Sequence, residues 1–170
     1  MAEPTPRTGR LIAVDGSRGK DVAAEAETLV TRLRARGVPC GISRWDASGL
    51  FADFVLADPE DLVVSPRTLA LMYAADLVFR LRWEIRPALA EGHVVLAAPY
   101  LDTATAIGVG LGLPDAWLRD VLRFADAPDL VVRARERKRG QGWKTGTTRG
   151  YGEYCAGLLE ASPAGLARRK

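Results

Sequence analysis

The stretch that decides the fold is Arg10-Leu-Ile-Ala-Val-Asp-Gly-Ser-Arg-Gly-Lys-Asp21. Its apolar run, 11–14, predicts a buried strand, the small residues of 15–19 predict a turn, and a helical pattern begins at Asp21. A strand, a Gly-rich turn, a lysine and a helix form the layout of a phosphate-binding loop, the P-loop or Walker A motif. In such loops, backbone N–H groups of the turn and of the helix N-terminus face an anion, and the lysine adds a full positive charge.

This motif departs from the usual pattern at two positions. Counting back from Gly19-Lys20, the first glycine of the pattern falls on Val14, which would put a Cβ where the chain must bend tightly. The Ser or Thr that normally follows the lysine is Asp21, and we expect its carboxylate to occupy the anion site as an internal phosphate mimic paired with Lys20. The sequence therefore predicts a degenerate Walker A motif. Its vestigial phosphate-binding residues are Gly16, Ser17, Arg18, Gly19, Lys20 and Asp21.

The composition indicates one globular domain with a proper core. The chain has 170 residues, of which 48% are hydrophobic and 26% charged. The net charge of +3 is small and spread along the chain, and no apolar run approaches the length of a membrane span, so we expect neither a nucleic-acid nor a membrane partner. Cys40 and Cys155 lack metal-ligand spacing, so we expect no metal site. The N-terminus is polar and does not fit a signal peptide, which predicts a cytoplasmic protein. We therefore expect the two cysteines to be reduced thiols, and a disulfide between them is the alternative.

Strands alternate with helices along the chain, which predicts an α/β fold: a P-loop NTPase-like, doubly wound parallel sheet with helices on both faces. We expect a disordered arm at 1–9, a single domain over 10–162 with a lid-like mobile loop at 135–149, and a polar tail at 163–170. The expected strands are 10–14, 41–44, 93–97 and 130–132. The expected helices are 21–36, 49–56, 66–86 with a kink or restart at Pro87, 103–112 as a helix or a turn, 114–124 and 150–160. We expect Gly37 and Gly92 to end the first and the long helix, and the first helix to bury one apolar stripe: Val22, Ala26, Leu29, Val30 and Leu33.

The order of these segments predicts four strands in the spatial order second, third, first, fourth. Pro39, just before the second strand, suits an edge position. The long helix starts at Ser65-Pro66, an N-cap followed by proline at the first position, and it carries apolar residues on more than one face. Trp45 and Trp143 fall in predicted loops, where an exposed tryptophan would mark a binding surface.

Three mid-chain stretches resemble the thymidylate kinase family of P-loop nucleoside monophosphate kinases. Leu71-Met-Tyr-Ala-Ala-Asp76 resembles the family's Leu-Leu-Phe-Ala-Ala-Asp-Arg helix, and Ile85-Arg-Pro-Ala-Leu-Ala-Glu-Gly-His-Val-Val95 resembles its Ile-x-Pro-Ala-Leu-x-x-Gly-x-Val-Val run. Phe124-Ala-Asp-Ala-Pro-Asp-Leu130 resembles the approach to its fourth strand. The resemblance covers 10–160 and implies a homodimer packed through the long helices, here 66–86.

The resemblance also implies which functional positions are altered. The family's Asp-Arg-Tyr after the third strand becomes Ala98-Pro99-Tyr100, and the arginine that contacts the base becomes Leu77. The closing Ala-Tyr-Gln becomes Ala106-Ile107-Gly108, and the family's fifth strand, which would follow 160, is expected to be missing. The remnants of the substrate site are Arg44, from the family's Arg-Glu-Pro, the base-stacking aromatic Tyr73, and Tyr100. On an apolar helix stripe, Tyr73 also fits a plain core role.

These losses predict a thymidylate-kinase-like pseudoenzyme with no catalytic residues and no cofactor. We expect it to act as a dimeric interaction or scaffold module. An unidentified protein partner is a further possibility. A second hypothesis is a non-catalytic nucleotide or anion sensor that uses Lys20, Arg44 and the turn 16–19. A third is an active ATP-dependent dTMP kinase with rearranged ligands, which alone would require Mg-ATP.

Overall fold

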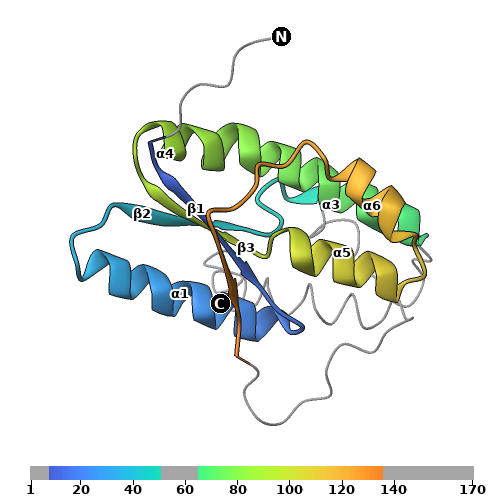
Figure 1. Cartoon of the computed structure of the whole chain (residues 1–170), viewed down its shortest axis with the longest axis horizontal. Helices are drawn as coiled ribbons and strands as arrows, with labels where there is room; N and C mark the ends of the chain where they lie inside the picture. Colours follow the sequence, from blue (N-terminus) through green and yellow to red (C-terminus); the bar gives the residue numbers. More distant parts are fainter. Residues whose placement is uncertain (1–7, 51–64, 136–170) are drawn as a thin grey trace.

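The computed structural model of the chain describes residues 8–50 and 65–135. Within them, four parallel strands form one sheet with helices on both sides (Figure 1). The spatial order is β2-β3-β1-β4, as the sequence predicts. The strands are β1 (Arg10–Asp15), β2 (Cys40–Arg44), β3 (Val94–Ala98) and β4 (Leu130–Arg133). The arm up to residue 7, the helices expected at 49–56 (beyond Leu50) and 150–160, the loop after Arg135, Trp143, Cys155 and the tail lie outside the described residues.

The two central strands are β1 and β3, which are apolar on both faces and therefore suit the middle of a covered sheet. In β1, Leu11 and Val14 are completely buried, and Leu96 of β3 is buried to the same degree. Ile12 of β1 lies in register with Leu96 on one side and with Leu130 of β4 on the other.

Helix α1 (Gly19–Arg34) covers one side of the sheet, and a continuous helical rod that contains α3 (Pro66–Arg80) and α4 (Arg86–Ala90) covers the other (Figure 1). Val22, Ala26 and Val30 of the predicted apolar stripe are buried against the strands. The helix ends as the sequence predicts: Gly37 has a φ of +73°, a conformation that favours glycine, and the N–H of Val38 bonds back to the carbonyl of Leu33 at 3.1 Å.

The long helix begins at its predicted cap, where the Ser65 hydroxyl accepts the N–H of Thr68 at 3.1 Å. It runs as α3 (Pro66–Arg80), widens into a π-helical segment η1 (Leu81–Ile85), and continues as α4 (Arg86–Ala90). Because Pro87 has no N–H and its ring crowds the carbonyl four residues back, a wider turn ahead of it keeps the rod continuous. Gly92, with a φ of +84°, follows the end of the rod.

Two shorter helices complete the described part: α5 (Leu101–Gly110) and α6 (Asp115–Val121). A Cβ on Gly108 would lie 2.6 Å from Leu118, so the glycine lets α5 and α6 touch. At the N-terminal end, the N–H of Gly9, assigned above to the arm, donates to Leu89 of α4 at 2.8 Å. Among the described residues, no helix is long and apolar enough to cross a membrane.

Candidate functional site

The turn after β1 is much shorter than a P-loop requires. Strand β1 ends at Asp15 and α1 begins at Gly19, which leaves only 16–18 between them. The expectation that the chain bends tightly at Val14 is therefore wrong, because Val14 lies inside β1 and is fully buried. Gly16 opens the bend instead, with two residues fewer before Gly19-Lys20 than the pattern contains.

Asp21 lies in the first turn of α1, where its carboxylate faces the helix N-terminus. Its side chain is 8% exposed, and Oδ2 lies 3.6 Å from Nη1 of Arg18. The ion pair that holds this carboxylate is therefore formed with Arg18, whereas the sequence predicted Lys20; the Lys20 residue is exposed. The Arg18–Asp21 pair cancels part of the positive potential that an anion would meet at this helix end. We call residues 16–21 the turn side of the site.

Asp15 connects the turn side to α5. It is 3% exposed, and its Oδ1 accepts the N–H of Tyr100 at 2.8 Å and that of Thr103 at 3.2 Å. The N–H of Gly16 donates in turn to the Thr103 hydroxyl at 3.1 Å. Burial raises the pKa of the Asp15 carboxyl, although these hydrogen bonds oppose the shift. This carboxylate satisfies two N–H groups at the start of α5, which have no partner within the helix.

On the other side of the sheet's carboxyl end, Tyr73 of α3 belongs to the core. It is 3% exposed, its hydroxyl donates to the carbonyl of Tyr100 at 2.9 Å, and burial raises the pKa of its phenol. The Trp45 ring lies 4.6 Å from the Tyr73 ring, centroid to centroid. Trp45 is only 4% exposed, so the expectation that it marks a binding surface is wrong: the loop that carries it folds inward over Tyr73.

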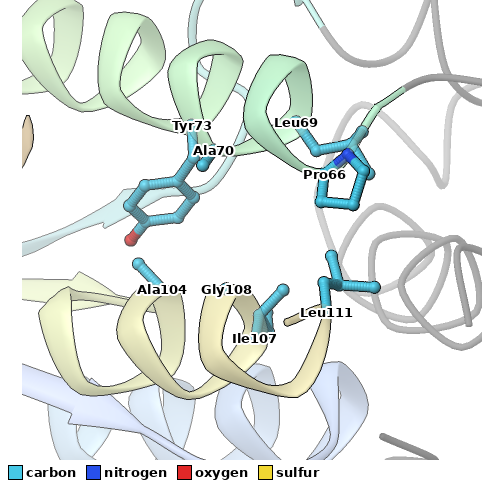
Figure 2. Close-up of a pocket in the computed structure, with 8 residues that line it drawn as sticks. All are labelled: Pro66, Leu69, Ala70, Tyr73, Ala104, Ile107, Gly108 and Leu111. Atoms are coloured by element: carbon cyan, nitrogen blue, oxygen red, sulfur yellow. The ribbon is translucent and has the colours of Figure 1, made fainter. Parts of the chain in front are cut away.

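The apolar space between α3 and α5 is small (Figure 2). Its volume of about 10 Å³ is about the minimum that holds one water molecule and leaves no room for an aromatic base. Tyr73 forms one wall, with the polar tip of its ring directed away from the space towards Tyr100. The residues that line it are Pro66, Leu69, Ala70, Tyr73, Ala104, Ile107, Gly108 and Leu111.

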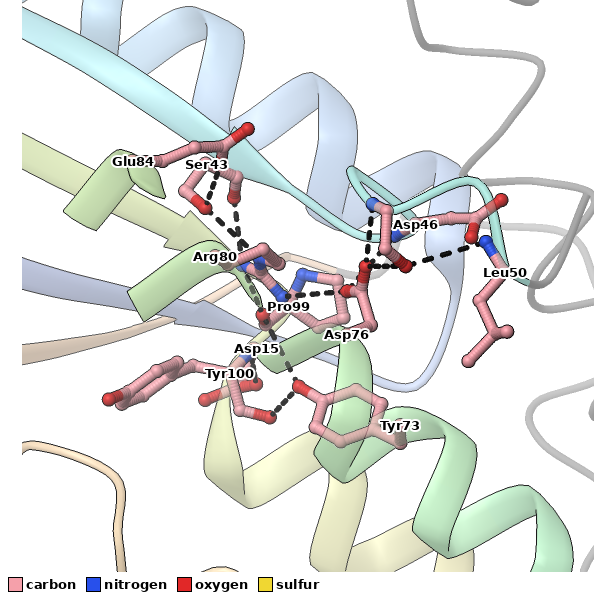
Figure 3. A network of polar contacts seen from close by, with 11 residues as sticks. Asp15, Ser43, Asp46, Leu50, Tyr73, Asp76, Arg80, Glu84, Pro99 and Tyr100 are labelled. Carbon is pink, nitrogen blue, oxygen red and sulfur yellow. Dashed lines mark hydrogen bonds and ion pairs between the residues drawn. The ribbon is translucent and has the colours of Figure 1, made fainter. Parts of the chain in front are cut away.

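Arg80 lies in the centre of a buried polar network (Figure 3). The side chain is fully buried; Nε donates to Ser43 Oγ at 2.9 Å, and Nη2 donates to the carbonyls of Ser43 at 2.8 Å and Pro99 at 3.1 Å. Nη1 lies 4.0 Å from Oδ2 of Asp76, which is also fully buried. The Ser43 hydroxyl donates to Glu84 of η1 at 2.6 Å. This network joins α3 and η1 to the ends of β2 and β3, and we call it, with Tyr73, the acceptor side.

The three predicted remnants of the substrate site do not converge on a shared cavity. Tyr100 is completely buried, and its hydroxyl donates to the carbonyl of Asp126 at 2.7 Å. Arg44, at the end of β2, forms an ion pair with Glu27 of α1. The hydrogen bond from the Tyr73 hydroxyl to the backbone carbonyl of Tyr100 connects two of the three residues without bringing their side chains together around a cavity. All three side chains therefore have structural partners within the described part of the chain.

No family model matches the sequence. Curated proteins do match over most of the chain. A thymidylate kinase of Leifsonia xyli is 32% identical over 140 residues, which cover 78% of this chain and 66% of that protein. A thymidylate kinase of Pseudomonas fluorescens is 36% identical over 74% of this chain and 63% of its own length. A thymidylate kinase of Thermomicrobium roseum is 31% identical over 71% of this chain and 60% of its own length.

The chain belongs to the thymidylate kinase family. It spans about two thirds, or less, of the length of the curated relatives that it matches. Its parallel sheet and flanking helices agree with the kinase fold that the sequence predicted.

Three residues of this thymidylate kinase relative carry much of the site geometry and were not singled out from the sequence: Asp15, Asp76 and Arg80. A signal for two of them was present. Asp76 and Arg80 are four residues apart on the helical stripe that also carries Leu69 and Tyr73, and charges at that spacing on an apolar stripe indicate a buried ion pair. Asp15 gives no such signal, because its partners lie more than 80 residues away.

The described residues do not fit the Mg-ATP that the family implies. A P-loop surrounds phosphates with the N–H groups of a long glycine-rich loop and holds Mg²⁺ with a hydroxyl. Here the turn is three residues long, and the residue after the lysine is the carboxylate Asp21, already paired with Arg18. Among the described residues, no group of three or more His, Cys, Asp or Glu side chains is placed to hold a metal.

Proposed function

We propose that this chain is a thymidylate-kinase-like pseudoenzyme: it does not transfer phosphate and acts as a dimeric interaction module. The observation that carries the proposal is the three-residue turn between β1 and α1. Phosphoryl transfer depends almost wholly on positioning and electrostatic stabilisation of the phosphates, and this turn offers few N–H groups for either. We propose no cofactor, because Asp21 and the short turn do not fit Mg-ATP.

The acceptor side supports the same proposal. The arginine that the family places after its third strand is Pro99 here, and the arginine that ends its Ala-Ala-Asp-Arg run is Leu77, which is completely buried. The space beside Tyr73, where the resemblance puts the base, holds about 10 Å³. Among residues 8–50 and 65–135, a nucleoside monophosphate beside Tyr73 would meet neither these two arginines nor the room that it needs.

The test is a coupled assay of ADP formation with Mg-ATP and dTMP. We expect no dTMP-dependent rate above background, and no difference between the wild-type protein and Lys20→Ala. Turnover by the wild-type protein that Lys20→Ala abolishes would overturn the proposal and support the active-kinase alternative.

The interaction surface of the proposal is the outer face of the long helix. Four large apolar side chains are exposed there, and a second copy of the chain could cover them in an isologous contact, as the family resemblance implies. They are Leu71 (52% exposed), Val78 (49%), Phe79 (38%) and Trp83 (63%).

A matched pair of variants tests this surface. Val78 and Val109 are both helical valines, 49% and 48% exposed, but only Val78 lies on the proposed face. By light scattering at tens of micromolar, we expect a dimer for the wild-type protein and for Val109→Asp, and a monomer for Val78→Asp. A wild-type monomer, or equal effects of the two variants, would contradict the proposal.

A nucleotide or anion sensor is the second candidate, and the exposed Lys20 beside the N-terminus of α1 favours it. Binding to the folded state raises stability by RT ln(1 + [L]/Kd), so millimolar Mg-ATP should raise the melting temperature if this function exists. A shift that Lys20→Ala removes, without ADP formation, would support the sensor.

A further inference from the structure

The turn after β2 directs three hydrogen-bond donors at one carboxylate (Figure 3). The N–H of Asp46 donates to Oδ2 of Asp76 at 3.2 Å, while the N–H and the hydroxyl of Ser48 donate to Oδ1 at 3.1 and 2.9 Å. Asp46 has a φ of +59°, in the left-handed region. Backbone N–H groups that converge in such a turn form a concave site for an anion.

Arg80 supplies the positive charge of this arrangement. Its Nε and Nη2 groups are fixed by Ser43 and Pro99, which leaves Nη1 on the side of Asp76, 4.0 Å from Oδ2. Nη1 is buried and makes no hydrogen bond. A buried guanidinium nitrogen of this kind needs an oxyanion beside it, and the Asp76 carboxylate is the one that the fold provides.

We propose that the turn 46–48 and Arg80 form a binding site for one small oxyanion, and that the carboxylate of Asp76 is its built-in ligand. The inference deepens the proposed function and rests on it in one respect: a site already filled by its own carboxylate has no place for a substrate phosphate. The ligand class is a carboxylate, because the Asp76 carboxylate accepts all three donors of the turn and lies beside the cation.

Removing the carboxylate and supplying it again from solution tests the site. Asp76→Ala leaves the donors of 46–48 and Arg80 without their anion, and we expect the melting temperature to fall by about 6–20 °C. Sodium formate, which carries the same group, should recover at least about 3 °C of this loss at 0.1–0.5 M. Sodium chloride at the same ionic strength should recover none of it.

Asp126→Ala is the matched control. Asp126 is a carboxylate paired with an arginine, Arg86, but it is partly exposed and far from the turn 46–48 in the sequence. Formate should stabilise this variant no more than it stabilises the wild-type protein. Equal gains from formate in the wild-type protein, Asp126→Ala and Asp76→Ala would overturn the proposal.

Hydrogen exchange of the wild-type protein keeps the proposal testable if Asp76→Ala does not fold. The amides of Asp46 and Ser48 lie in a turn, and both donate to the carboxylate of Asp76. We expect them to exchange at least about tenfold more slowly than unstructured amides, and exchange at the unstructured rate would overturn the proposal. Neither experiment uses a nucleotide, so kinase turnover would refute the proposed function without changing their result.

Discussion

The turn side and the acceptor side differ in how their charged groups are satisfied. On the turn side, Lys20 is exposed, and the buried carboxylate of Asp21 pairs with Arg18, whose side chain is 28% exposed and in contact with water. On the acceptor side, Asp76 and Arg80 are completely buried and depend on partners from β2, β3 and the turn 46–48. Water can compensate a change at the surface, whereas a buried charge that loses its partner is left uncompensated. Substitutions should therefore reduce stability much more on the acceptor side.

The largest effect is expected for Arg80→Leu. It removes three hydrogen bonds and leaves Asp76 buried without its cation, so the free energy of unfolding should fall by about 3–5 kcal/mol. Arg44→Leu, which breaks the partly exposed pair with Glu27, is the control and should cost about 0–1 kcal/mol. Urea unfolding measures both values. Equal losses would remove the distinction between buried and exposed arginines.

Asp15 joins the two sides, and its substitution should have the next largest effect. Asp15→Ala leaves the N–H groups of Tyr100 and Thr103 without an acceptor and should cost about 2 kcal/mol or more. Asp15→Asn keeps an oxygen acceptor at this position and should cost much less. A loss for Asn as large as that for Ala would contradict this assignment.

The pH dependence of the stability difference between Asp15→Asn and the wild-type protein gives a second test of Asp15. Because burial raises the folded-state pKa of Asp15 above 3.8, the folded protein binds the proton more tightly than the unfolded chain. The associated stability is present below pH 3.8 and is lost as the pH rises through the folded-state pKa. The melting temperature of Asp15→Asn relative to the wild-type protein should therefore increase from pH 4 to pH 7. A constant or decreasing difference would mean that the carboxyl is not shifted upwards.

A smaller effect is expected for Tyr73→Phe. The substitution keeps the ring against Trp45 but leaves the carbonyl of Tyr100 without the phenol donor, which should cost about 1 kcal/mol. Thermal unfolding with added dTMP measures this loss and tests whether the tyrosine has a second role. If dTMP stabilises the wild-type protein but not Tyr73→Phe, the acceptor side is open to nucleotides.

The smallest effect is expected for Asp21→Thr on the turn side. It restores the hydroxyl of the P-loop pattern, but the turn 16–18 stays short and Pro99 remains in place of an arginine. The substitution breaks the pair with Arg18, which stays partly exposed to water, so we expect the free energy of unfolding to fall by less than about 1 kcal/mol. We expect ADP formation to stay at background. A large gain in the coupled assay would show that Asp21 alone blocks catalysis.

The sequence predicts best those features that depend on neighbouring residues. Ser65-Pro66, Gly37 and Gly92 mark the ends of their helices correctly, because caps and left-handed turns are local. The alternation of strands and helices also predicts the strand order, since parallel strands joined by crossover helices leave few topologies.

Features that depend on distant contacts could not be predicted in the same way. The motif predicts a bend at Val14 because it assumes the usual loop length, whereas the end of β1 depends on pairing with β3 and β4. The hydrogen bonds of the Asp76–Arg80 network join residues 19 to 41 positions apart, so no short pattern reveals them. The choice between a core and a binding role for Tyr73 likewise required its contacts with Trp45 and Tyr100.

The strand order has a consequence for how the chain folds during its synthesis. Strand β1 is made first, but Ile12 pairs with Leu130 of β4, which is made 118 residues later. At ribosomal speeds this interval is on the order of ten seconds, during which one edge of an apolar strand has no partner. We therefore expect the nascent chain to be most prone to aggregation before β4 emerges, and a ribosome-bound fragment that ends before residue 130 to engage chaperones more than one that includes it.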